Sequence, residues 1–227
     1  MKLSLSIFNL SIATALVFSF LSNSSFSQST HLHPLLNAVS TGFNYGNINS
    51  ELQSYKKRIT GGQLGVSFQA GITPNFSVVT EPYFIMKGGV LKANNPLTTN
   101  KSTVRLYALE MPLLGRIHFG KVYFNTGPYV AYNMGGRIKT EGSETIPATS
   151  TAISFDDAVA GYKRWETGVQ AGAGYLFKLK KSSLALDLRY GYGLTSISRG
   201  DDRYNRVLTI SAVVFKPWKK NPLAKTV

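Results

Sequence analysis

Three ionisable side chains stand within one otherwise apolar stretch, LYALEMPLLGRIHFG at residues 106–120. They are Glu110, Arg116 and His118. A carboxylate and an imidazole are the usual groups of general acid–base catalysis, and a guanidinium can hold an anionic substrate. All three have even numbers, whereas the odd positions from Tyr107 to Phe119 carry no charge. Because side chains alternate between the two faces of a β-strand, this stretch is predicted to be a strand with one apolar and one charged face.

The composition and the first residues indicate an exported protein. The 227 residues carry a formal net charge of +14 and include no cysteine, which excludes disulfides, thiolate metal sites and thiol nucleophiles. Residues 1–27 combine Lys2, an apolar run of about 14 residues and a small polar end. Since a transmembrane helix needs roughly 20 apolar residues, this segment is predicted to be a cleaved signal peptide.

The same period of two recurs along the rest of the chain, with no sustained helical period. It predicts eight strands, over residues 38–46, 62–72, 76–88, 106–120, 122–134, 162–178, 183–195 and 206–218. Short connections at 73–75, 120–121 and 179–182 alternate with long polar ones at 47–61, 89–101, 135–161 and 196–205. The predicted fold is therefore all-β, an eight-stranded antiparallel up-and-down transmembrane β-barrel with short periplasmic turns and long extracellular loops.

Aromatic residues on the apolar parity support this architecture. They gather next to the short turns and next to the long loops, as expected for aromatic girdles at two membrane interfaces. The residues are Phe76, Phe84, Tyr107, Phe119, Tyr132, Trp165, Phe177, Tyr192 and Trp218. A lipocalin-like soluble barrel would instead point its apolar side chains inward. Because an eight-stranded interior is narrow, the glycine-rich, charged parity is assigned to the inside.

Four acidic and four basic residues fall on that inward parity. They are Glu81, Lys87, Glu110, Arg116, Arg164, Glu166, Asp187 and Arg189. An unpaired charge in so narrow a space is costly, so we expect a mutually satisfied lumen charge network that plugs the barrel. An ion path lined by these residues, or a partial opening, remains the alternative.

Other candidate sites are weak. His31 and His33 lie in the predicted linker, and His118 lies inward at the periplasmic end, away from the surface where a lipid hydrolase would act. Gly172 and Gly174 lie within a predicted strand, whereas a phosphate loop precedes a helix. The acidic pairs at 156–157 and 201–202 lack the ligand spacing of a calcium loop. We therefore expect no enzymatic activity, no metal site and no cofactor.

The basic residues are scattered over loops and turns, with no helix or stacking platform to organise them, which argues against nucleic-acid binding. We expect them to meet anionic outer-membrane lipid, including lipopolysaccharide. Other expected partners are the barrel-insertion machinery and envelope proteins that contact the extracellular loops.

Several phrases occur together in order: FSVVTEPYFIMKGG at 76–89, VYFNTGPYVAY at 122–132, LALDLRYGYGLTSI at 184–197 and NRVLTISAVVF at 205–215. With the Glu110-Met111-Pro112 motif, they resemble the Bacteroidota-type outer-membrane β-barrel family, the PorT-like or "porin family" proteins. The resemblance covers about residues 62–215 and implies location in a Gram-negative outer membrane. It brings no catalytic or ligand residues.

The predicted organisation is a cleaved signal peptide at 1–27, a linker at 28–37, the barrel at 38–218 and a basic tail at 219–227. The predicted role is that of a barrel with a side-chain-plugged lumen and a structural, adhesive or accessory function. The alternatives are a narrow porin-like channel and an accessory component of a secretion or surface-assembly complex, of which the type IX secretion PorT-like subgroup is one example.

Overall fold

The computed structural model describes residues 31–73, 75–142, 147–156, 161–179 and 183–215. The predicted signal peptide, Trp218 and the basic tail lie outside these residues.

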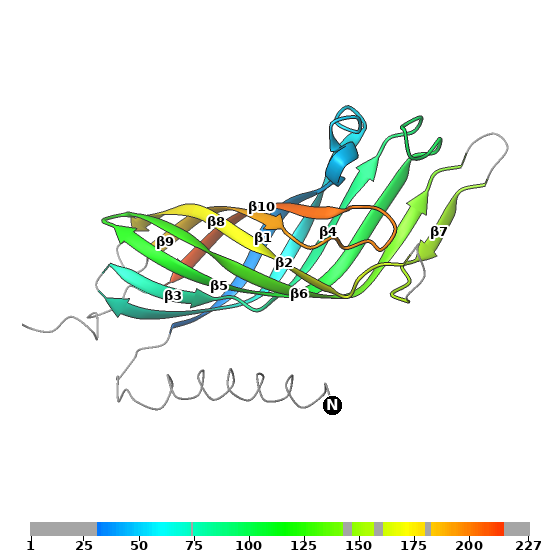
Figure 1. Cartoon of the computed structure of the whole chain (residues 1–227). Helices are drawn as coiled ribbons and strands as arrows, with labels where there is room; N and C mark the ends of the chain where they lie inside the picture. The colour runs from blue at the N-terminus through cyan, green and yellow to red at the C-terminus, as the bar shows by residue number, and fades with distance from the viewer. Residues whose placement is uncertain (1–30, 74, 143–146, 157–160, 180–182, 216–227) are drawn as a thin grey trace, which may run out of the picture.

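The described chain is almost entirely β-strand (Figure 1). The elements are β1 (His31–Asn44), the short 3-10 helix η1 (Gly46–Asn49), β2 (Lys56–Thr73), β3 (Phe76–Thr80), β4 (Tyr83–Leu91), β5 (Ser102–Phe119), β6 (Val122–Thr140), β7 (Thr149–Ala152), β8 (Trp165–Lys178), β9 (Ser183–Gly193) and β10 (Tyr204–Phe215).

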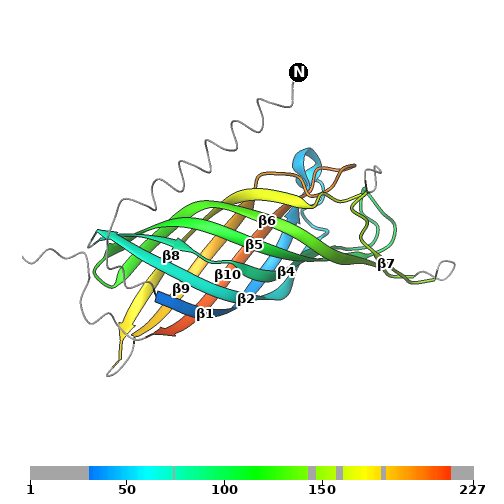
Figure 2. The same ribbon diagram turned by 90° about the horizontal axis from the view of Figure 1, so that it is seen from below.

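These strands form a closed antiparallel ring. Most strands pair with their neighbours along the chain, and β1 pairs with β10 to close the sheet, as in Val39 opposite Thr209. β3 and β4 share one position between β2 and β5, while β7 pairs only with the far end of β6. The ring therefore has eight strand positions, and the prediction of an eight-stranded up-and-down barrel is confirmed. Figure 2 shows the strands curving around a common interior.

The break between β3 and β4 has a local cause at Pro82. Proline has no backbone N–H and cannot donate to the ladder. The carbonyl of Pro82 still accepts a hydrogen bond from the N–H of Val66, 3.1 Å away. The inward parity continues across the break, since Val79, Glu81 and Tyr83 are all buried.

Several strands extend beyond their predicted ends. β1 begins at His31 instead of residue 38, so most of the predicted 28–37 linker belongs to the barrel wall. β2 begins at Lys56 instead of 62, and β6 continues to Thr140 instead of 134. In each case the backbone pairing continues where the apolar alternation has stopped; His31 to Thr41, for example, pair without interruption with Gln69 to Ile59.

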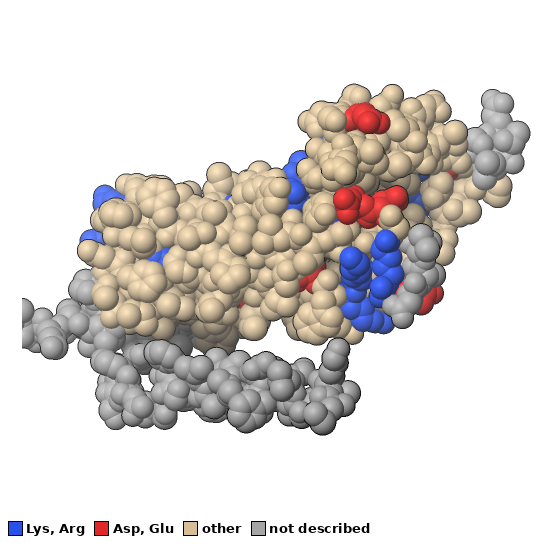
Figure 3. Space-filling view, in the orientation of Figure 1, with Lys and Arg blue, Asp and Glu red and all other residues tan. Residues whose placement is uncertain are grey.

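The two faces of the ring differ as predicted. Apolar side chains cover the outside, with Leu36 74% and Val214 65% exposed, while Asn125, Gln63 and other polar side chains are buried inside. Figure 3 shows few charged side chains over the flank of the barrel and more of them toward the end that carries β7. Within the described residues, no helix has the length and apolarity needed to cross a membrane.

Candidate functional site

The centre of the lumen contains a three-membered ion cluster. The ammonium of Lys87, from β4, lies 2.9 Å from Glu110 Oε2 on β5 and 2.8 Å from Glu166 Oε2 on β8. The side chains of Lys87 and Glu166 are 0% exposed. One cation thus bridges two carboxylates across the interior of the barrel.

Neutral donors hold the remaining carboxylate oxygens. The Tyr83 hydroxyl donates to Glu110 Oε1 at 2.6 Å, and the Tyr129 hydroxyl donates to Glu166 Oε1 at 2.7 Å. The Gln170 amide adds a bond to Glu110 Oε1, and the Asn205 amide adds one to Glu166 Oε2. We call these seven residues the central ionic layer: Tyr83, Lys87, Glu110, Tyr129, Glu166, Gln170 and Asn205. Because they come from β4, β5, β6, β8 and β10, the layer connects most of the wall through the lumen.

A second set of charges lies toward the short turns. Arg189 of β9 is 2.5 Å from Glu81 Oε2 and 3.3 Å from Asp187 Oδ1. Ser67 donates to Glu81 at 3.1 Å, and Asn125 donates to Asp187 at 2.9 Å. We call this set the lower ionic layer; here one cation is shared by two carboxylates, as in the central layer.

Arg116 lies inside the barrel but outside both layers. Its Nη1 donates to Gln69 Oε1 at 3.0 Å, and its guanidinium lies 4.4 Å from the centre of the Tyr123 ring. Among the described residues, no carboxylate lies within ion-pair distance of it, and its buried Nε has no hydrogen-bond partner. Arg116 is therefore stabilised by an amide and an aromatic face.

His118 does not assemble a hydrolytic site. Its Nε2 lies 2.9 Å from the Ser77 hydroxyl, which is the contact that a nucleophile and its base would make. Ser77 is only 2% exposed, however, and its hydroxyl also accepts a bond from the Gln69 amide. Within the described part of the chain no carboxylate orients His118, so the pair lacks the third group of a triad.

The prediction that Arg164 belongs to the lumen network is wrong. β8 begins only at Trp165, so Arg164 precedes the strand and the parity rule does not apply to it. Its exposed guanidinium lies 4.5 Å from the ring centre of Phe155 and 5.7 Å from that of Tyr132.

The lower ionic layer borders a cavity of about 210 Å³ near the short-turn end. Glu81, Asp187 and Arg189 form part of its lining, together with Arg116, His118 and Tyr123. This volume is large enough for several water molecules. The barrel interior is thus filled at its centre and partly open at this end.

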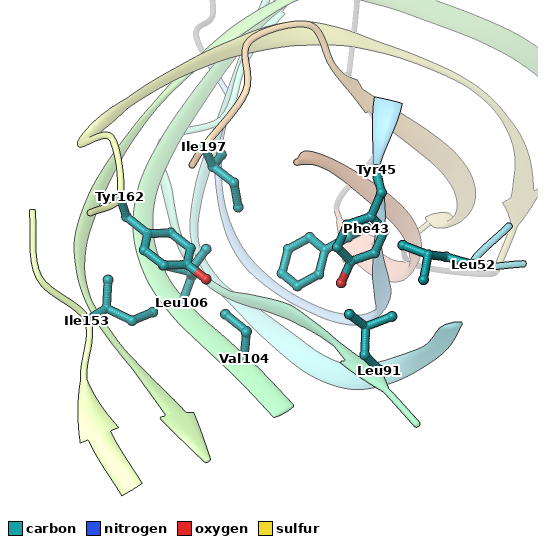
Figure 4. Packing of buried hydrophobic residues seen from close by; sticks show 9 residues of the cluster. All are labelled: Phe43, Tyr45, Leu52, Leu91, Val104, Leu106, Ile153, Tyr162 and Ile197. Carbon is teal, nitrogen blue, oxygen red and sulfur yellow. The ribbon is translucent and has the colours of Figure 1, made fainter. Parts of the chain in front are cut away.

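Buried apolar side chains from strands and long connections form a cluster at the opposite end (Figure 4). We call this group the mouth cluster: Phe43, Tyr45, Leu52, Leu91, Val104, Leu106, Ile153, Tyr162 and Ile197. Arg203 lies over the rings of Phe43, Tyr45 and Tyr162, and it donates a short hydrogen bond to the Tyr162 hydroxyl. Burial raises the pKa of the Tyr45 phenol to about 12, although Arg203 acts in the opposite direction.

The predicted girdle residues that the structure describes lie on the outer face, most of them in contact with another aromatic ring. Near the long loops, Phe84 stacks on Tyr107 at 6.1 Å and Tyr132 meets Trp165 edge-on at 5.0 Å. Near the short turns, Phe119 lies 6.1 Å from Phe124, and Phe177 lies 4.6 Å from Tyr175. Phe76 and Tyr192 complete the two groups, on β3 and β9.

Sequence reasoning overlooked the neutral members of the central ionic layer. Tyr83, Tyr129 and Gln170 all lie on the charged parity of their strands, which was the available signal. This signal could not predict their role, because parity shows which face of the strand a side chain lies on but not which residue it contacts across the lumen. No group of three His, Asp or Glu side chains that could hold a metal ion occurs among the residues that the structure describes.

The sequence matches a known family, and the structure resembles solved structures. Residues 26–199 match the family model described as outer membrane protein beta-barrel domain. Two solved structures are similar at low identity. The Neisserial surface protein A is 10% identical with a TM-score of 0.44, and the match covers 83% of this chain and 99% of that chain. Ail of Yersinia pestis is 12% identical with a TM-score of 0.40, and the match covers 81% of this chain and 96% of that chain. No curated protein matches the sequence.

Proposed function

We propose that this chain is a non-conducting barrel with a structural, adhesive or accessory role. The premise is that the chain belongs to the outer membrane protein beta-barrel domain family and is located in the outer membrane. The observation that carries the proposal is the fully buried Lys87 between Glu110 and Glu166. A cation held by two carboxylates, with four neutral donors around them, leaves no continuous water path across the centre of the lumen. The mouth cluster adds a second closure at the long-loop end.

The proposed orientation has the long connections outside the cell and the short turns in the periplasm. This is the arrangement typical of bacterial outer-membrane barrels. The two groups of outward aromatic residues then lie at the two lipid–water interfaces. Residues 1–27 serve as the cleaved export signal, and the barrel-insertion machinery is the expected partner during assembly.

Fractionation and solute flux test this proposal. The folded protein should be recovered with outer membranes and should migrate faster on a detergent gel before boiling than after it. Vesicles that contain the purified protein should swell in small-sugar solutions no faster than empty vesicles. Recovery as a periplasmic soluble protein would overturn the membrane assignment, and swelling at porin-like rates would overturn the closed lumen.

A second candidate function is that of an accessory component of a secretion or surface-assembly complex, as in the PorT-like subgroup. The observation that favours it is β7, which pairs with β6 on one side and, among the described strands, has no partner on the other. Its residues Thr149 to Ala152 are all exposed and uncharged. Such an edge can accept an additional strand from a partner protein.

Site-specific crosslinking distinguishes this second candidate. A photoreactive residue at Ser150 should capture an envelope protein in intact cells, whereas the same group at Lys121, in a short turn, should not capture that protein. Recovery of only the insertion machinery from both positions would remove the support for an accessory role.

The third candidate, a narrow channel, is favoured by the cavity of about 210 Å³ at the short-turn end. A channel would require this cavity to connect through both ionic layers to the mouth. It predicts ion currents that change when Arg116→Gln or Arg189→Gln alters the lining, whereas a closed barrel gives no currents to change.

A further inference from the structure

Four cations line one groove on the side of the barrel near the long-loop end. Lys56, Lys57 and Arg58 come from the start of β2, and Arg206 comes from the start of β10. β2 and β10 are the two neighbours of β1, so closure of the ring brings these distant residues together. The groove has a volume of about 290 Å³. We call it the basic groove.

The charges of the basic groove are not neutralised as those of the lumen are. Lys56 donates to Asn49 Oδ1 at 2.6 Å, and Arg58 donates to the Ser40 hydroxyl at 2.9 Å. Arg206 donates to two backbone carbonyls, those of Gly193 at 3.0 Å and Asn205 at 2.8 Å. Across the described residues, no carboxylate lies within ion-pair distance of any of the four, in contrast to Lys87 and Arg189.

The four cations share one groove whose lining includes no carboxylate. A positive field of this kind favours a bound anion. Guanidinium groups match phosphate oxygens in particular, because their N–H donors form a planar fork.

The position of the groove indicates where the anion comes from. Tyr190 lines the groove and is also exposed on the outward apolar face, where it is the next outward residue of β9 after Leu188. The ring centre of Tyr192 lies 3.4 Å from the Arg206 guanidinium. The groove therefore stands where the outer face changes from apolar to basic, at the height expected for lipid headgroups.

Gly42 contributes to the shape of the groove. A Cβ atom at this position would lie 3.2 Å from Cγ of Arg58, tighter than an ordinary contact. The missing side chain lets the stem of Arg58 lie across β1, which is how its guanidinium reaches the carbonyl oxygens of Ser40 and Arg206.

We propose that the basic groove binds a phosphate group of an outer-leaflet glycolipid, of the diphosphorylated lipid A type. The inference rests on the proposed orientation, with the long connections at the outer leaflet. The cationic side chains of the groove contact the phosphate of the lipid, and the apolar outer face of the barrel contacts its acyl chains. The bound lipid would make the barrel selective for the leaflet that contains such glycolipids.

Native mass spectrometry of the full mature protein tests the proposal, with diphosphoryl lipid A as the probe. Wild type should retain one lipid A molecule. The Lys57→Gln variant, which changes an exposed side chain, should bind about fivefold more weakly, and Lys57→Gln with Arg58→Gln more weakly still. The matched control is Lys121→Gln, which removes one exposed cation at the short-turn end and should leave binding unchanged.

Further arms separate the source of the phosphate. Lipid A without phosphates should bind at least tenfold more weakly, and millimolar inorganic phosphate should not displace the diphosphoryl form. Equal binding of wild type and Lys57→Gln, or of lipids with and without phosphates, would overturn the proposal. Displacement by inorganic phosphate would show a free-anion site and would overturn the assignment to a lipid. The vesicle-swelling measurement does not involve the groove, so failure here and failure of the closed-lumen proposal are distinguishable.

Discussion

The two proposed closures of the barrel, at the centre of the lumen and at its mouth, use opposite chemistry. The central ionic layer places one ammonium between two carboxylates, and every charged atom there has a specific partner. Two amide oxygens of the layer, Gln170 Oε1 and Asn205 Oδ1, are buried without a hydrogen-bond partner among the described residues. The mouth cluster instead packs apolar side chains from strands and connections, with Arg203 over three of its aromatic rings. The first closure depends on charge balance and position, whereas the second depends on the apolar area removed from water.

This difference has a physical consequence for each region. A buried ion cluster adds little to stability when complete, but removal of one partner leaves an uncompensated charge in a low-dielectric interior. An apolar cluster loses stability in proportion to the side chain removed. We therefore expect single substitutions to have larger effects in the central layer than in the mouth.

Lys87→Met should produce the largest loss of stability. It keeps a similar side-chain length but leaves Glu110 and Glu166 without their cation. We expect the free energy of unfolding to fall by about 3–5 kcal/mol in a urea titration of the protein in lipid vesicles. The matched control is Lys101→Met, which removes the exposed Lys101–Glu141 pair and should cost no more than about 1 kcal/mol. Equal losses in the two variants would show that the central layer is not effectively buried.

Arg189→Met should cost less than Lys87→Met. It leaves Glu81 and Asp187 without their cation, but both line the cavity of about 210 Å³, where water can solvate them. We expect a loss of about 3 kcal/mol or less in the same titration. A loss larger than that of Lys87→Met would contradict the difference between the two ionic layers.

Leu52→Ala should loosen the mouth without unfolding the barrel. Leu52 is fully buried in the mouth cluster but lies in the connection between β1 and β2. We expect a local loss of about 2 kcal/mol, seen as faster hydrogen exchange in that connection. Leu97→Ala, at an exposed leucine of another connection, should leave exchange unchanged. Simultaneous loss of protection in the central strands would mean that the mouth cluster is not a separate unit.

Alkaline pH should also weaken the mouth. The pKa of the Tyr45 phenol rises from the ordinary 10.0 to about 12 on folding, so the folded protein holds this proton more tightly than the unfolded chain. The contribution to stability is complete below pH 10 and is lost as the pH rises toward 12, by about 1.4 kcal/mol per pH unit. The free energy of unfolding of wild type should therefore fall more steeply with pH in this range than that of Tyr45→Phe. Parallel pH profiles would contradict the burial of this hydroxyl.

The alternation of side chains predicted the wall of the barrel and the face of most interior charges. Lys87, Glu110 and Glu166 could be placed inside because each lies within a strand whose parity is unambiguous. Arg164 could not, because parity has no meaning before the strand begins at Trp165. The start of β1 was also placed too late, because His31 to Asn37 contain a proline and two histidines that obscure the period.

Partners across the lumen and in the mouth lie beyond sequence reasoning of this kind. The pairing of Lys87 with Glu166 depends on how the ring closes and on the stagger between strands, which no single strand encodes. The mouth cluster joins Leu52, Ile153 and Ile197 from three separate connections, none of which has a regular period. The basic groove likewise exists only because β10 returns to pair with β1.

Single-channel recording in planar bilayers examines the closed lumen itself. Purified wild-type protein, inserted alongside a large porin as a positive control for insertion and recording, should give no stable conductance steps of its own. Reproducible wild-type steps, altered in size by Arg189→Gln, would instead demonstrate a conducting path through the ionic layers and would contradict the closed barrel.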